Sequence, residues 1–297
     1  RDHFRVVTGG AHGMADRKWF QDHLADGATL TDLTDELSTI GLWGPKARDI
    51  LAPLTGDDLS GTGFGFLTCR EITVAGVSAP VLASRISYVG ELGWELYVPM
   101  AAAAELWDVL LTTGRGHGVI PAGIGVYATT GRLEKGYRAY GAELDAERTI
   151  VQAGMARPKV KQADFVGKQA YLRQRGTEPE RVMCTLTVDD HTSASGMKRY
   201  MLGGEPILTR DGQPLTDGHG RHPYVTTAAS APSLGKHVLM AFLPPAQAVP
   251  GTELAVSYME QLFPVTVASA DATPLLDPDN LRVKGRYAEL AADAGGA

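Results

Sequence analysis

The sequence predicts an α+β protein in which antiparallel sheets and helices are followed by a small C-terminal β-barrel. Helical and strand-like apolar patterns alternate through the first part of the chain, and after Arg181 the pattern turns almost wholly to short strands. The chain contains 35 glycines and 17 prolines, which favour many turns and a substantial β content. Hydrophobic residues make up 44% of the 297 residues, which is enough for a sizeable buried core.

The first part of the chain is predicted to combine helices with strands. Pro45 stands near the start of a helix, where the missing N–H of proline costs nothing. Leu106 and Leu110 fall at helical spacing, and Gly114 follows as a helix-ending residue. The expected helices are 15–24, 46–51, 101–113 and one that carries 132–137, and the expected strands are 3–8, 38–43, 66–69, 71–74 and 80–88.

The last part of the chain is predicted to form a separate β domain. Residues 172–181 are charged and contain glycine and proline, which is typical of a linker. Six short strands at close spacing then favour a small antiparallel barrel. The expected domains are therefore 1–176 and 182–285, and the tail from Ala288 is expected to be frayed. The expected strands of the barrel are 182–188, 206–210, 224–227, 237–243, 253–258 and 264–268.

The segment from Arg85 to Pro99 carries the most informative polar residues. It is predicted to form two strands joined by a tight turn at Gly90 and Gly93. Glu95 lies between two large apolar residues, where a carboxylate is costly unless it is hydrogen-bonded. One hypothesis is that Glu95 accepts two N–H groups of a ligand, such as the amino-pyrimidinone edge of a pterin. The other is that Glu95 points outward from a half-buried strand and is solvated, which composition alone favours.

The same segment resembles a motif of the folate-binding aminomethyltransferase family. Residues 87–97 read Ser-Tyr-Val-Gly-Glu-Leu-Gly-Trp-Glu-Leu-Tyr and are similar to the Tyr-x-Gly-Glu-x-Gly-x-Glu segment of that family. The family includes the glycine cleavage T-protein and the folate domains of dimethylglycine and sarcosine dehydrogenases and oxidases, and the form here resembles the latter group most. Further similar segments follow in family order, at 132–138, 140–144, 151–155 and 164–168.

The resemblance implies a folate-binding aminomethyltransferase-like domain over 1–176, N-terminally incomplete, and the family's β-barrel domain over 182–285. It implies that Tyr88 and Glu95 contact the pterin of tetrahydrofolate. It places the family's catalytic acid before residue 1, so no catalytic residue is expected in this chain, and Asp2 at the terminus is not expected to replace it. The sequence departs from the family near Tyr127, where it has one extra residue and lacks an arginine that contacts folate in some members.

The implied function is tetrahydrofolate-dependent one-carbon transfer. The carbon would come from an N-methyl amine such as dimethylglycine or sarcosine, as an iminium made by a flavin domain or subunit, and the product would be 5,10-methylenetetrahydrofolate. The function of a glycine cleavage aminomethyltransferase or of a folate-dependent O-demethylase is an open alternative. A folate-binding regulatory protein without transfer activity also stays open.

Composition argues against several other classes. The net charge is −6 without a basic cluster, which disfavours nucleic acid as a partner, and no apolar run approaches the about 20 residues that span a bilayer. Cys69 and Cys184 are far apart and form no metal or disulfide motif, which favours a cytoplasmic location without a bound metal. The polar run 189–193 contains acid, base and nucleophile types, but adjacent side chains point apart, so a polar loop is preferred to a hydrolase site.

Overall fold

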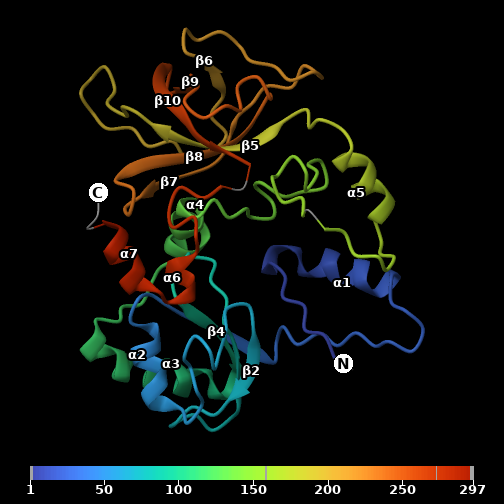
Figure 1. Cartoon of the computed structure of the whole chain (residues 1–297), viewed down its shortest axis with the longest axis vertical. Coiled ribbons are helices and arrows are strands. Elements are labelled where there is room, and N and C mark those ends of the chain that lie inside the picture. Colours follow the sequence, from blue (N-terminus) through green and yellow to red (C-terminus); the bar gives the residue numbers. More distant parts are fainter. Residues whose placement is uncertain (1–2, 158, 272, 295–297) are drawn as a thin grey trace. The chain divides into compact units, whose positions relative to one another are not determined.

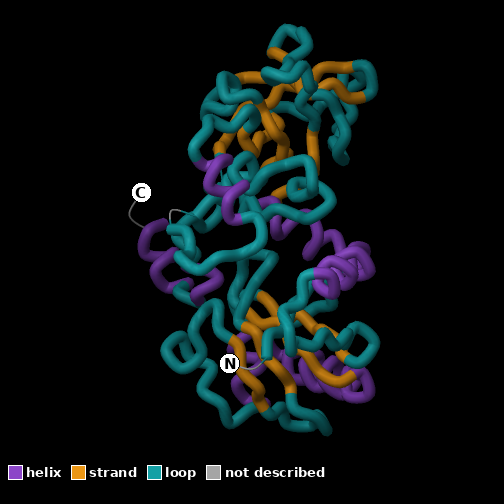
Figure 2. The backbone as a smooth tube through the Cα atoms, turned by 90° about the vertical axis from the view of Figure 1, so that its right-hand side faces the viewer, coloured by secondary structure: helices purple, strands orange, loops and turns teal. Residues whose placement is uncertain are grey.

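The computed structural model of the chain describes residues 3–157, 159–271 and 273–294, which belong to two compact units. Unit 1 comprises residues 1–86 and 93–120, and unit 2 comprises residues 87–92 and 121–297. Figure 1 labels their elements along the chain. Much of the backbone is loop and turn, drawn in teal in Figure 2, as the content of glycine and proline predicts.

Unit 1 is built on a four-stranded antiparallel sheet with the strand order β1-β4-β3-β2. Its strands are β1 (Leu37–Trp43), β2 (Cys69–Ile72), β3 (Val81–Ser84) and β4 (Gly93–Pro99). The side chains of Trp94, Leu96 and Val98 alternate along β4 and are fully buried. Because successive side chains of a strand point to opposite faces, Glu95 and Tyr97 share the other face.

The helices of unit 1 are short, and two of them bury apolar side chains. Ile50 and Leu51 of one helix and Leu106 and Leu110 of another are buried, as their spacing predicts. The α-helices are α1 (Gly13–Asp22), α2 (Ala47–Leu51) and α3 (Ala103–Gly114), and the 3-10 turns are η1 (Gly10–His12), η2 (Ala52–Leu54), η3 (Met100–Ala102) and η4 (Arg115–His117).

Three predictions about the strands of unit 1 are wrong. Residues 3–8 form no strand, and Phe4 among them is 84% exposed, because no neighbouring strand accepts their backbone hydrogen bonds. The expected strands 66–69 and 71–74 are replaced by the single strand β2. The expected tight turn is a loop of residues 85–92 that links β3 to β4, since the last pair between these strands is Ser84 with Glu95.

The six strands of unit 2 form the predicted barrel. The strands are β5 (Val182–Val188), β6 (Ile207–Thr209), β7 (Val225–Ala231), β8 (Lys236–Leu243), β9 (Glu253–Tyr258) and β10 (Gln261–Ala270), in the order β6-β9-β10-β5-β8-β7. A bridge between Pro206 and Tyr224 joins the two outer strands, and Val225 N donates to Glu205 O at 2.9 Å. These contacts link the edges of the sheet, which removes its unpaired edge groups.

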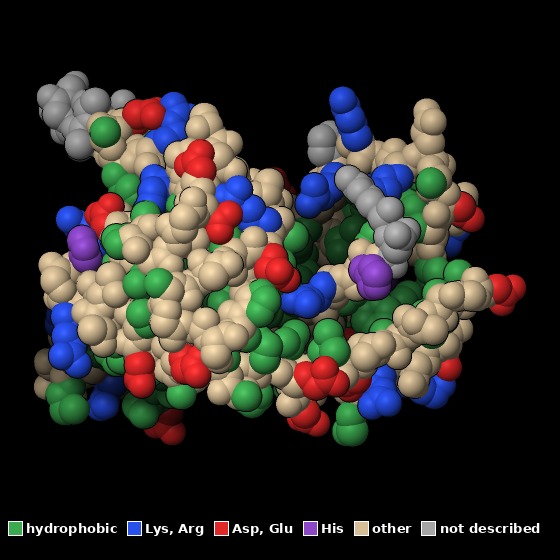
Figure 3. Space-filling model, turned by 90° about the horizontal axis from the view of Figure 1, so that it is seen from below, with side chains coloured by type: hydrophobic (Ala, Val, Ile, Leu, Met, Phe, Trp, Pro, Cys, Tyr) green, Lys and Arg blue, Asp and Glu red, His purple; other side chains and the backbone are tan. Residues whose placement is uncertain are grey.

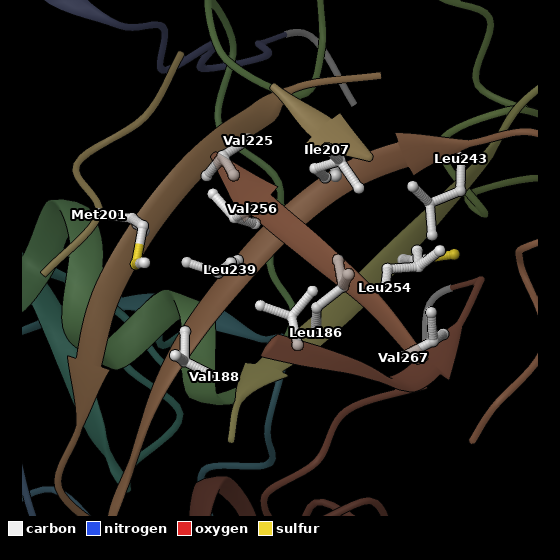
Figure 4. Close-up of a cluster of buried hydrophobic side chains, with 14 of the residues drawn as sticks. Leu186, Val188, Met201, Ile207, Val225, Leu239, Leu243, Leu254, Val256 and Val267 are labelled. Atoms are coloured by element: carbon white, nitrogen blue, oxygen red, sulfur yellow. The ribbon is translucent and has the colours of Figure 1, made fainter. Parts of the chain in front are cut away.

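Apolar side chains fill the interior of the barrel. Figure 4 shows Leu186 of β5, Leu239 of β8, and Leu254 and Val256 of β9 pointing toward one another. All four are buried, as period-two alternation along each strand predicts.

Unit 2 also contains helices, and they change two expectations. They are the π-helix η5 (Val126–Gly131), α4 (Arg132–Glu134), α5 (Lys168–Arg175), α6 (Leu281–Lys284) and α7 (Tyr287–Ala294). The first residues of the expected linker therefore belong to α5, and the tail expected to be frayed from Ala288 is helical as far as Ala294. The predicted boundary between domains 1–176 and 182–285 stays a prediction.

Within the described ranges, the longest helix has 12 residues, and none has the length and apolarity that crossing a membrane requires. On the face drawn in Figure 3, Lys and Arg side chains are interspersed with Asp and Glu.

Candidate ligand-binding site

Glu95 lies in the central strand of the sheet in unit 1. β4 pairs with β1 on one side and with β3 on the other, so Glu95 stands opposite Gly41 and Ser84. Its side chain is half-buried, and Oε2 accepts a hydrogen bond from the Tyr97 hydroxyl at 2.5 Å. Oε1 accepts no hydrogen bond from the described residues. Because a carboxylate offers about four acceptor positions, Glu95 keeps the capacity to accept N–H groups from a ligand.

Two aromatic residues flank Glu95 on the same face of the sheet. A Cβ atom built on Gly41 would lie 2.1 Å from the ring of Trp43, so the indole covers the position opposite Glu95. The Trp43 indole N–H donates to Ile86 O at 3.0 Å, which fixes the ring. The guanidinium of Arg5 lies 5.9 Å from the centre of the Tyr97 ring. A half-buried carboxylate between two aromatic rings fits a flat heterocycle with adjacent N–H donors.

Tyr97 and Trp43 are not among the site residues that the sequence predicts. A signal for Tyr97 was present, because residues two apart on a strand share a face. Trp43 is only half-buried, and its place over Gly41 depends on the pairing of β1 with β4. Trp94 is fully buried, whereas Trp107 is 42% exposed.

Tyr88 lies in unit 2, on the loop Ser87–Leu92. Its hydroxyl donates to Arg138 O at 2.8 Å, and its ring is stacked with that of Tyr137 at a centroid distance of 6.0 Å. Burial raises the pKa of Tyr88, so its hydroxyl remains a donor at neutral pH. Tyr88 and Glu95 are seven positions apart in the chain but belong to different units.

The region of the predicted extra residue near Tyr127 forms the π-helix η5. A π turn contains one residue more than an α turn, so η5 accommodates an added residue without shifting the helix that follows. The ring of Tyr127 lies 5.2 Å from that of Tyr88. Tyr127 therefore stands beside Tyr88, at the point of the chain where some family members carry an arginine.

A buried polar network in unit 2 supports this region. Arg132 forms an ion pair with Glu143 at 2.9 Å, and both side chains are almost fully buried. Arg132 Nη2 also donates to Thr227 Oγ1 at 2.8 Å, and the hydroxyl of Thr226 donates to Glu143 Oε1 at 2.7 Å. Because both threonines belong to β7, the network joins α4 to the barrel.

Arg132 and Glu134 do not lie on one face of a helix, so the sequence predicts that one is buried and the other exposed, and this prediction is wrong. Both are buried, and Glu134 Oε1 accepts the backbone N–H of Ser233 at 2.7 Å. The helix α4 is only three residues long and is enclosed, so helical spacing does not separate a solvent face from an interior face.

Two further predictions concern residues outside or beside this region. Asp2, considered as a substitute for the family acid, lies outside the described residues. Among the described residues, no group of three or more His, Cys, Asp and Glu could hold a metal ion.

Two domain families match the sequence. The GCVT N-terminal domain matches residues 1–161, and the glycine cleavage T-protein C-terminal barrel domain matches residues 181–273. The first match alone covers more than half of the chain. The chain therefore belongs to the glycine cleavage T-protein family, as the motif at 87–97 predicts.

Curated relatives include two kinds of enzyme. Human mitochondrial dimethylglycine dehydrogenase is 30% identical over 272 residues, which cover 89% of this chain and 29% of that protein. The aminomethyltransferase of Halalkalibacterium halodurans is 30% identical over 283 residues, which cover 94% of this chain and 71% of that protein. This chain thus spans less than a third of the dimethylglycine dehydrogenase and most of the aminomethyltransferase.

A solved structure supports the fold. The glycine cleavage system aminomethyltransferase T from Bartonella henselae aligns with a TM-score of 0.70 and 23% identity, over 89% of this chain and 67% of that chain. The predicted fold class, an aminomethyltransferase-like domain with antiparallel sheets and helices and a C-terminal barrel, is confirmed.

Proposed function

We propose that this chain binds tetrahydrofolate and acts in one-carbon transfer, with Tyr88 and Glu95 as contacts to the pterin. The observation that carries the proposal is the half-buried carboxylate of Glu95, which is oriented by Tyr97 and keeps free acceptor capacity beside the Trp43 ring. A pterin presents two adjacent N–H donors on a flat ring, and a carboxylate matches them with two parallel hydrogen bonds.

The residues of this chain would bind and orient rather than exchange protons. Bound tetrahydrofolate supplies the nucleophilic nitrogen that captures a one-carbon unit. Glu95 would fix the pterin edge, and Tyr88 would contact the ring from a loop packed against Tyr137. Holding two reactants in the correct geometry lowers an activation barrier by about 7–11 kcal/mol in favourable cases. Positioning is therefore the main catalytic contribution expected of this chain.

We further propose that the carbon donor is an iminium derived from an N-methyl amine such as dimethylglycine or sarcosine, made on a flavin domain or subunit. The motif form at 87–97 and the relationship to dimethylglycine dehydrogenase support this choice. A lipoyl-bound aminomethyl group, as in glycine cleavage, is the second candidate, supported by the relationship to aminomethyltransferases. A cytoplasmic location stays a prediction.

Two measurements test the proposal. Calorimetry with a reduced folate should show binding at one site per chain, and absence of binding would contradict the function. Formation of 5,10-methylenetetrahydrofolate should then be followed with formaldehyde, with an amine-derived iminium and with an aminomethylated lipoyl protein as donors. Product from the lipoyl protein alone would favour the second candidate, and folate binding without product from any donor would favour a regulatory protein.

A further inference from the structure

The loop Ser87–Leu92, which carries Tyr88, is held by residues near the end of unit 2. Arg282 Nη1 donates to Glu91 Oε1 at 2.7 Å, and the Tyr287 hydroxyl donates to Glu91 Oε2 at 2.6 Å. The same hydroxyl accepts the backbone N–H of Leu92 at 3.2 Å. Tyr287 therefore binds both the side chain and the backbone of the loop, although it lies 196 positions from Glu91.

A buried lysine makes a second connection between the loop and the same segment. Gly90 has a φ of +80°, and a Cβ atom built there would lie 2.3 Å from Lys135 Cγ, so the lysine stem packs directly against the loop. Lys135 is 1% exposed, and its Nζ donates to Asp277 O at 2.5 Å and to Asn280 Oδ1 at 3.0 Å. The Lys135 side chain thus joins the loop, through its stem, to residues 277–280, through its ammonium group.

Asp277 organises the start of this segment. Its carboxylate accepts the backbone N–H of Leu281 at 2.7 Å and that of Arg282 at 3.1 Å. These two hydrogen bonds fix the first turn of α6 and the backbone position from which the Arg282 side chain extends. Asp277 and Asn280 have φ values of 50° and 59°, a conformation that Asp and Asn tolerate better than most residues. These residues lie beyond residue 273, where the match to the family's barrel domain ends.

We propose that Asp277, Arg282 and Tyr287 form a clasp that fixes the loop Ser87–Leu92 and so positions Tyr88 for the ligand. The inference rests on the proposed function of Tyr88. The clasp residues contact Glu91 and Leu92 rather than the ligand, so they are positioning residues. A loop that is already ordered loses less conformational freedom on binding, which raises affinity without a new contact.

The protonation states agree with this arrangement. Burial, and then the hydrogen bond to Glu91, raise the pKa of Tyr287, so the phenol stays protonated and donates. Burial lowers the pKa of Lys135, whereas the charge of Asp277 opposes that shift.

The clasp is tested first without folate, by hydrogen exchange of backbone amides in the whole chain. Arg282→Gln removes one hydrogen bond to the loop and Tyr287→Phe removes two, so exchange at Glu91 and Leu92 should accelerate by about three- to tenfold for each bond lost. The matched controls are Tyr258→Phe in the barrel and Arg286→Gln, whose side chain pairs with Glu289 on the surface. Unchanged exchange in the clasp variants, or equal acceleration in the controls, would overturn the clasp.

The positioning role is tested next by calorimetry with a reduced folate. Tyr287→Phe and Arg282→Gln should raise Kd by about three- to tenfold, Arg282→Lys should recover part of the loss, and the two controls should bind as the wild type does. Faster exchange with unchanged Kd would overturn the positioning of Tyr88. If the wild type bound no folate, the proposed function would be contradicted instead. The exchange rates would then still show whether the clasp holds the loop.

Discussion

The hydroxyl of Tyr97 donates a hydrogen bond to Oε2 of Glu95 at 2.5 Å, from two positions further along the same face of β4. The bond uses one acceptor position of the carboxylate and restricts its rotation. Glu95 is therefore oriented before any ligand arrives, which distinguishes it from a solvated strand glutamate.

Glu95→Gln should weaken the binding of a reduced folate by about 1.5–3 kcal/mol, because the amide replaces one charged acceptor with a donor that opposes the pterin N–H groups. Calorimetry measures the change. Glu71→Gln is the matched control, since Glu71 is an exposed glutamate on β2 of the same sheet. Equal affinities for Glu95→Gln and the wild type would remove Glu95 from the site.

Tyr97→Phe should have a smaller effect on the same measurement, about 0.5–1.5 kcal/mol, because it removes one hydrogen bond that orients Glu95 and leaves the charge in place. Tyr258→Phe controls for the loss of a tyrosine hydroxyl elsewhere. A loss in Tyr97→Phe as large as in Glu95→Gln would mean that Tyr97 contacts the ligand itself.

Glu143→Ala should lower the free energy of unfolding by about 3–5 kcal/mol, because it leaves the charge of Arg132 buried without its carboxylate. Urea denaturation measures the change. Glu253→Gln breaks an exposed ion pair with Arg210 and should cost less than about 1 kcal/mol. If the two variants lowered the free energy of unfolding by similar amounts, the network around Arg132 would not be shielded from water.

Acidic pH should destabilise unit 2 through His237. The residue is 4% exposed, its Nε2 lies 3.1 Å from Met201 O, and its Nδ1 is buried without a partner among the described residues. Burial lowers the pKa of His237 below its ordinary value, and the charge of His191 adds to this, while the Met201 carbonyl and Glu205 oppose it. A lowered folded-state pKa means that the stabilisation is complete above about pH 6.5 and is lost as the pH falls toward the folded-state pKa.

The free energy of unfolding should therefore fall as the pH is lowered below about 6.5 in the wild type, and less steeply in His237→Gln. His117→Gln, at an exposed histidine, should keep the slope of the wild type. If the free energy of unfolding fell equally steeply with pH in the wild type and in His237→Gln, His237 would not be the cause of the acid destabilisation.

Limited proteolysis tests the domain boundary. Trypsin should cut first after Arg175, because α5 ends there and residues 176–180 are irregular and mostly exposed. Arg181 is 9% exposed and lies 3.4 Å from Asp217, so cleavage there should be slower. First cleavage within the barrel strands would contradict a separate domain from residue 182.

The barrel strands and the helices of unit 1 could be predicted from the amino-acid pattern, although several of their ends are shifted, as for β7 and β10. β5 and β9 begin and end at the predicted residues, because an alternating pattern is a local property of a strand, although the side chains of β5 are buried on both faces. The motif at 87–97 likewise identified the family and singled out Tyr88 and Glu95 without any knowledge of their surroundings.

Which polar groups are buried together could not be predicted, because it depends on contacts between distant parts of the chain. Lys135 donates a hydrogen bond to Asp277, 142 positions further along the chain, and Arg132 donates one to Thr227, 95 positions further along. Local periodicity carries no information over such separations in sequence. The same holds for residues 3–8, whose strand-like pattern has no partner strand, and for the tail from Ala288, which belongs to the helix that begins at Tyr287. A pattern along the chain fixes which face a residue prefers, whereas its partner is set by the long-range packing that brings two distant segments together.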